Sequence, residues 1–195
     1  MTNELFKDRE RANEAVYFRD QDARLLESLR RQAPLREIAS AIGEKLEVDN
    51  PELLERVRHL GLKPENATAL FMAPLVQVAW SDGSVTRAEH DAVLRLAGGR
   101  GIEPGTPEYE KLEEWLHSRP SDETFDTAVE VLKFGFDVLP PNEREERIVR
   151  VVQACDEVAR ASGSGLSGLL GLGSKVSANE ASTLDEISRT LRSEG

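Results

Sequence analysis

The apolar residues of this chain recur three or four positions apart, which is the spacing of an α-helix, along almost its whole length. The β-branched residues never alternate with polar ones over a run long enough to form a half-buried strand. The sequence therefore predicts an all-α protein. With 195 residues and 39% apolar side chains, the chain can support one sizeable core.

Capping residues and helix breakers divide the chain into a series of expected helices. A long, densely charged helix is expected over about residues 3–32, before Pro34, and a short amphipathic helix over 35–42. Asn50 and Pro51 supply the N-cap and the first residue of the next helix. The remaining expected helices run over 67–80, from Thr86 to Leu96, from Pro107 to Leu116, from Asp122 to Leu139, from Asn142 to Ala161, and from Ser177 to Leu191.

The apolar residues of 67–80 cover more than one helical face, which predicts a single, central and largely buried helix. The later helices each begin at a residue type that caps helix N-termini, and these expected caps are Thr86, Thr106, Ser121, Asn142 and Ser177.

Composition excludes several classes of protein. A net charge of −11 would repel phosphate backbones over most of the surface, so DNA and RNA are not expected partners. No run approaches the ~18 apolar residues of a membrane helix, and the first residues lack the pattern of a secretion signal. Cys155 is the single cysteine, which excludes an internal disulfide framework and indicates a reducing, cytoplasmic location.

A half-motif occurs twice. The first copy runs from Val78 to Glu89, and the second begins at Val158, is interrupted after Gly163, and resumes at 176–180. In both copies an apolar helix ends at a glycine, and a hydroxyl residue then stands three positions before a glutamate. That pattern predicts a capping box, formed by Thr86 with Glu89 in one copy and by Ser177 with Glu180 in the other.

The first copy also resembles the second half of a calcium-binding loop. In such a loop two further acidic ligands come first, but Val78 and Trp80 stand in their places, so this is not an EF-hand. Asp82 and Glu89 can still bind a divalent ion weakly if another acidic side chain approaches them in space. The alternative is that both residues serve only the turn and the cap.

These residues resemble the TerB-like, tellurite-resistance-associated helical domains, over about residues 64–191. The resemblance lies in the apolar helix before Trp80, in the turn and cap from Asp82 to Glu89, and in 176–180 with Leu184 and Ile187 after it. It implies a bundle of two pseudo-repeated helical units with a divalent-cation site built from acidic residues. The matching positions are Asp82, Glu89 and Glu180. Ser162 and the insertion after it depart from the pattern, which puts a second, symmetric metal site in doubt.

The other candidate groups favour plainer roles. His59, His90 and His117 lie in different expected helices without the spacing of a metal motif, so each is expected at a surface or a helix end. Cys155 lies in an apolar helix and is expected to be a buried, inert thiol. The glycine-rich and leucine-rich insertion 163–175 predicts a loop whose leucines fold back on the domain or contact a partner.

Together these features predict an N-terminal helical extension over 1–62 and a TerB-like helical domain over 63–195. The expected function is that of a non-enzymatic, acidic accessory protein linked to metal or oxyanion stress, with a cation such as Ca²⁺ bound at Asp82, Glu89 and Glu180. A protein partner or self-association is expected. The alternative is a metal-independent interaction scaffold that uses the N-terminal helix and the 163–175 loop.

Overall fold

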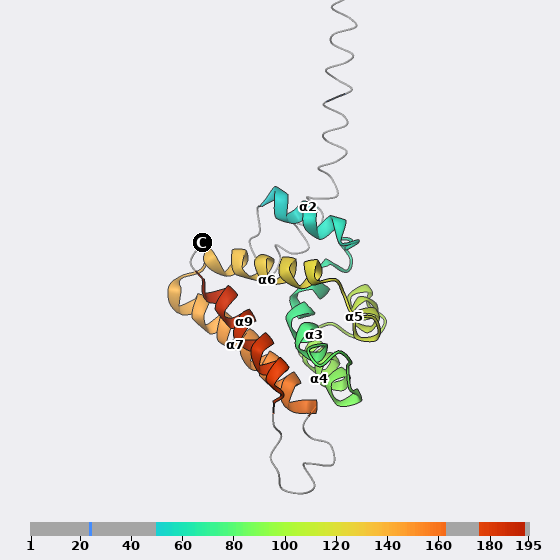
Figure 1. The fold of residues 1–195 in the computed structure, drawn as a ribbon. Coiled ribbons are helices and arrows are strands. Elements are labelled where there is room, and N and C mark those ends of the chain that lie inside the picture. Colours follow the sequence, from blue (N-terminus) through green and yellow to red (C-terminus); the bar gives the residue numbers. More distant parts are fainter. Residues whose placement is uncertain (1–23, 25–49, 163–175, 194–195) are drawn as a thin grey trace, which may run out of the picture.

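A computed structural model describes residue 24 and the ranges 50–162 and 176–193, and every regular element within them is a helix (Figure 1). No strand occurs in these ranges, so the all-α prediction is confirmed. In order, the elements are α2 (Pro51–His59), the 3₁₀ helix η1 (Ala67–Met72), α3 (Ala73–Ala79), α4 (Arg87–Gly98), α5 (Pro107–His117), α6 (Asp122–Asp137), α7 (Pro141–Ser162) and α9 (Ala178–Arg192). None of the helices described is long and apolar enough to cross a membrane.

Several predictions lie outside the described residues. They are the long helix over 3–32, the short helix over 35–42, and the loop 163–175 that follows α7. The scaffold interpretation depends on two of these segments, so it stays a prediction.

Most helix starts follow from local capping chemistry. The Asn50 side chain accepts hydrogen bonds from the backbone N–H groups of Glu52 and Leu53, at 3.1 and 3.2 Å, and Pro51 is the first residue of α2. Further N-caps stand where they were expected, at Thr86, Thr106, Ser121 and Ser177.

Two predictions at helix boundaries are wrong, and a proline explains each. The expected single helix over 67–80 is η1 followed by α3, because Pro74 has no N–H to continue the α-helical ladder back to Leu70. Asn142 is not an N-cap, since α7 already begins at Pro141, whose fixed φ and missing N–H suit the first helical position.

Helix α3 is the centre of the molecule. It contacts α4, α5, α6, α7 and α9, and Val76 and Val78 at its middle are completely buried. Around it, α7 and α9 lie side by side and α6 packs across their upper ends (Figure 1). The prediction that the apolar segment before Trp80 is central and buried is therefore confirmed, although the segment is two helices rather than one.

Helix α2 belongs to the same core. Its buried residues are Leu53, Leu54 and Val57, and it packs on α6. The Arg56 guanidinium pairs with Glu130 of α6 and donates to the Thr127 hydroxyl at 3.0 Å. The boundary predicted between residues 62 and 63 thus falls after a helix that shares its apolar face with the rest of the fold.

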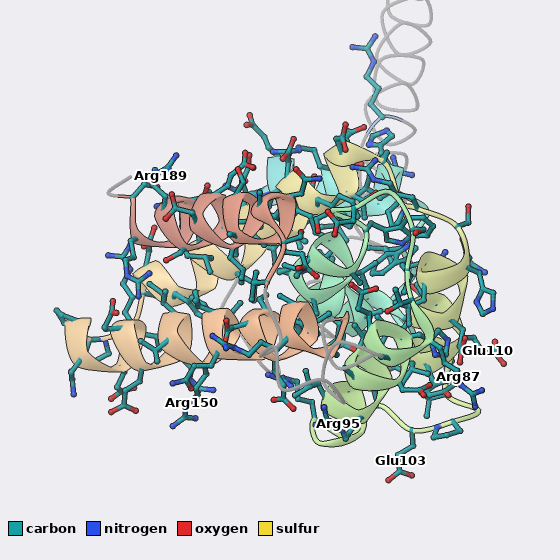
Figure 2. All side chains as sticks on the ribbon, turned by 60° about the horizontal axis from the view of Figure 1, so that its bottom comes forward. Arg87, Arg95, Glu103, Glu110, Arg150 and Arg189 are labelled. Carbon is teal, nitrogen blue, oxygen red and sulfur yellow. The ribbon has the colours of Figure 1, made fainter. Side chains whose placement is uncertain are left out.

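Charged side chains cover the outside of the bundle. Figure 2 shows Arg95, Arg150 and Arg189 extending outward from α4, α7 and α9, and Glu103 and Glu110 extending outward near α5. Most of the acidic side chains from Glu103 to Glu146 are exposed, as a solvated surface requires.

Candidate functional site

The turn after α3 belongs to the first copy of the repeated motif, and it contacts the second copy in space. Gly83 has a φ of +85°, a left-handed conformation that glycine adopts without strain, and its N–H bonds the Trp80 carbonyl at 2.9 Å. This turn presents the Asp82 carboxylate to the start of α9. Asp82 Oδ1 accepts hydrogen bonds from the Ser177 hydroxyl and from the Asn179 amide, both at 3.0 Å.

Both predicted capping boxes are present. Glu89 Oε2 accepts from the Thr86 N–H at 2.6 Å, and the Thr86 hydroxyl accepts from the Glu89 N–H at 3.3 Å. In the second box, Glu180 Oε2 accepts from the Ser177 N–H at 2.5 Å, and the Ser177 hydroxyl accepts from the Glu180 N–H at 3.1 Å. The Ser177 hydroxyl therefore accepts from Glu180 and donates to Asp82, which joins the second box to the first turn.

The two box glutamates meet in the interior of the protein. Glu89 is 3% exposed and Glu180 is completely buried, so both carboxyl groups are withdrawn from water. The two side chains are close enough that Glu180 acts on the carboxyl group of Glu89 through its charge and through hydrogen bonding. A hydrogen bond between two carboxyl groups needs a proton on one of them.

Burial raises the pKa of Glu89 above its ordinary value of 4.5. The hydrogen bonds from the Thr86 backbone and side chain favour the ionised form and lower the pKa, but less than burial raises it. The charge of Glu180 and its hydrogen bond raise the pKa further. This combination of desolvation and a like charge is typical of carboxyl pairs that bind a proton or a cation.

The structure thus brings together the three residues predicted as metal ligands. Asp82 reaches the cap of α9 through Ser177 and Asn179, and Glu89 contacts Glu180 directly. Their role in metal binding stays a prediction. Ser162, where the second turn lacks an aspartate, is the last described residue before the 163–175 range.

A second group of potential ligands was missed by sequence reasoning. His90 of α4 and Glu113 and His117 of α5 each place a ligand atom within 4.8 Å of the other two. Glu113 and His117 are four residues apart on one helix, which was a visible signal. His90 is 23 residues before Glu113, and only the packing of α4 on α5 places it beside them.

Cys155 is completely buried, as expected, and burial raises the pKa of its thiol to about 12. A thiol with such a pKa stays protonated at neutral pH and is neither a nucleophile nor a metal ligand there. Its role is to fill space in α7.

Comparison with protein-family models, with curated proteins and with solved structures finds no match for this chain. The resemblance to TerB-like domains therefore rests on the motif residues alone.

Proposed function

We propose that this protein is a non-enzymatic, acidic helical accessory module of the TerB-like kind, which responds to a divalent cation such as Ca²⁺ bound at Asp82, Glu89 and Glu180. The observation that carries the proposal is the contact between the buried carboxyl groups of Glu89 and Glu180, each from the first turn of a different helix.

Two adjacent carboxylates in a place with little water cannot both be ionised without a positive partner. A proton supplies that charge when no metal is bound, and a hard divalent cation with oxygen ligands can replace it. The N-terminal ends of α4 and α9 favour ionised carboxylates, so both capping boxes can persist after the proton has left.

Asp82 adds a third carboxylate at the start of α9, where Ser177 and Asn179 hold it. Ca²⁺ takes six to eight oxygen ligands, more than these side chains readily supply, so water would complete the shell. We therefore expect weak binding, with a Kd on the order of 10⁻⁴–10⁻³ M.

Cation binding would link α4 to α9 more tightly than the proton does. The turn after α3 and the N-cap of α9 already contact each other through Asp82, so this region would stiffen as one unit. In this proposal the stiffened surface is offered to a protein partner or to a second copy of the chain, in the cytoplasm and without a catalysed reaction.

The test is a calorimetric titration of the metal-stripped protein with Ca²⁺ and with Mg²⁺, repeated in two buffers with different ionisation enthalpies. We expect saturable binding accompanied by release of the proton held between Glu89 and Glu180. Glu180→Gln and Glu89→Gln should abolish that binding, and Asp82→Ala should weaken it. Trp80 fluorescence gives a local signal, because its indole N–H donates to the Trp115 carbonyl at 2.8 Å, close to the turn.

Glu123→Gln is the matched control, since Glu123 is an exposed carboxylate in the first turn of α6. It should leave the titration unchanged. Absence of binding up to millimolar cation, or binding that survives Glu180→Gln, would contradict the cation site. The glutamate pair would then be a structural contact that shares a proton.

The scaffold alternative makes a different prediction. It requires that deletion of residues 1–33 changes the oligomeric state or removes a partner, whereas the cation proposal requires neither. Light scattering on the full chain and on the deleted chain, each with and without Ca²⁺, separates the two functions.

A further inference from the structure

We propose that His90, Glu113 and His117 form a binding site for a first-row transition-metal ion, with Zn²⁺ as the representative ion. The site is separate from the carboxylates of the proposed cation site. It lies between α4 and α5, whereas Glu89 and Glu180 join α4 to α9.

The distances suit coordination. Glu113 Oε2 lies 3.0 Å from His90 Nε2 and 3.5 Å from His117 Nδ1. Tetrahedral Zn²⁺ binds nitrogen and oxygen at about 2.0–2.2 Å, which places its ligand atoms about 3.4 Å from one another. The two imidazole rings are nearly perpendicular, at 87° with centroids 5.8 Å apart, so they approach Glu113 from different directions.

The ligand types select the class of metal. Two imidazoles and one carboxylate suit Zn²⁺ and neighbouring transition metals, whereas Ca²⁺ and Mg²⁺ prefer oxygen ligands alone. Three protein ligands leave a coordination position for water, as in open zinc sites.

Neighbouring groups orient two of the ligands. The other ring nitrogen of His90, Nδ1, lies 3.4 Å from Asp91 Oδ1, which is the carboxylate–histidine arrangement often found behind metal ligands. Tyr109 lies one helical turn before Glu113, and burial and the interaction with that carboxylate raise the pKa of the tyrosine. His117 Nδ1 lies 2.8 Å from the Glu113 carbonyl, and metal binding would exchange this hydrogen bond for a coordinate bond.

The group is accessible from solvent. The side chains of His90 and Glu113 are 25% and 30% exposed, and that of His117 is 73% exposed. A metal ion can therefore reach the ligands without unfolding of α4 or α5. His90 directly follows Glu89, but successive helical residues point about 100° apart, so the two proposed sites use different sides of α4.

The chain contains a matched control for this site. His59 and Glu55 on α2 repeat the local pairing of His117 and Glu113: His59 Nδ1 lies 2.8 Å from the Glu55 carbonyl and 3.8 Å from its carboxylate. Their exposures are similar, at 68% for His59 and 73% for His117. The pair on α2 is not part of the three-residue group, so it reports what an ordinary Glu–His pair binds.

The experiment uses the untagged, metal-stripped full chain. Zn²⁺ affinity is measured by competition with a chromophoric chelator, and Co²⁺ absorption in the visible region reports the ligand geometry. We expect one saturable site whose Zn²⁺ affinity falls at least about tenfold in His90→Gln and in His117→Gln. His59→Gln should leave the affinity and the Co²⁺ spectrum unchanged.

The outcomes separate this proposal from the proposed function. Glu89→Gln should leave Zn²⁺ affinity unchanged, and His117→Gln should leave the Ca²⁺ titration unchanged. Because the His117 side chain is largely exposed, His117→Gln should keep the helical circular dichroism of the wild type. Equal losses in His59→Gln and His117→Gln, loss of Zn²⁺ binding in Glu89→Gln, or no binding at all would each overturn the transition-metal site.

Discussion

At the scale of single residues, the buried carboxyl group of Glu89 connects the stability of the fold to pH. Its pKa is raised in the folded protein, chiefly by burial, so between pH 4.5 and the folded pKa the native state binds more protons than the unfolded state. The contribution of Glu89 to the free energy of unfolding is therefore greatest at low pH. It falls as pH rises through this window and then stays constant.

Glu89→Gln tests this linkage. Glutamine keeps an oxygen for the Thr86 N–H and replaces the acid O–H by an amide donor that does not titrate. We expect the stability difference between Glu89→Gln and wild type to shift in favour of the variant as pH rises from 4.5 toward neutrality. Urea unfolding at a series of pH values measures this difference. The stability difference between Glu123→Gln and wild type should not change with pH in this way. A difference that does not vary with pH would show that the pKa of Glu89 is unchanged on folding.

At the scale of helices, the two capping boxes should differ in strength although their local geometry is alike. Thr86→Ala removes a cap and should cost about 1 kcal/mol. Ser177→Ala removes a cap and also the hydroxyl that donates to Asp82, so it should cost more. Denaturant unfolding of both variants at one pH gives the comparison.

A double-mutant cycle isolates the contact between the turn and the second cap. Asp82→Ala and Ser177→Ala should be non-additive, with a coupling of at least about 0.5 kcal/mol. Thr106→Ala is the control, because Thr106 caps α5 through the Tyr109 N–H and does not bond Asp82. It should be additive with Asp82→Ala. Additivity in both cycles would mean that the hydrogen bond from Ser177 to Asp82 contributes nothing to stability.

Local chemistry also decides how much could be predicted from the sequence. The starts of α2, α4 and α9 follow from residues within three positions, and these were predicted. Two helix boundaries were not predicted, and each lies at a proline. The missing N–H of Pro74 outweighed the continuous apolar pattern of 67–80. Pro141 took the first helical position of α7, so Asn142 does not cap that helix. The contact of Glu89 with Glu180 and that of His90 with Glu113 are set by tertiary packing, which no local pattern encodes.

At the scale of the whole molecule, α2 should unfold together with the bundle. Leu54 is 4% exposed and shares the common core, so Leu54→Ala should cost about 2–5 kcal/mol. Trp115 lies in that core and Trp80 packs against it, so their fluorescence reports its unfolding. We expect Leu54→Ala to lower the thermal midpoint measured by tryptophan fluorescence and by circular dichroism equally.

The exposed Glu52 on the same helix supplies the control. Glu52→Ala should change the free energy of unfolding by no more than about 0.5 kcal/mol. If Leu54→Ala left the tryptophan transition unmoved, α2 would be an independent extension, as the boundary predicted between residues 62 and 63 implies.

The contact of Glu89 with Glu180 joins equivalent positions of two equivalent caps, which is the form of an isologous contact in a symmetric dimer. In a dimer, dilution would separate the two carboxyl groups, and their affinity for a proton or a cation would depend on protein concentration. Here a single chain carries both, so the second glutamate is always present at the effective concentration that the fold imposes. Glu89 should therefore titrate identically in dilute and in concentrated solution, as a property of each separate molecule.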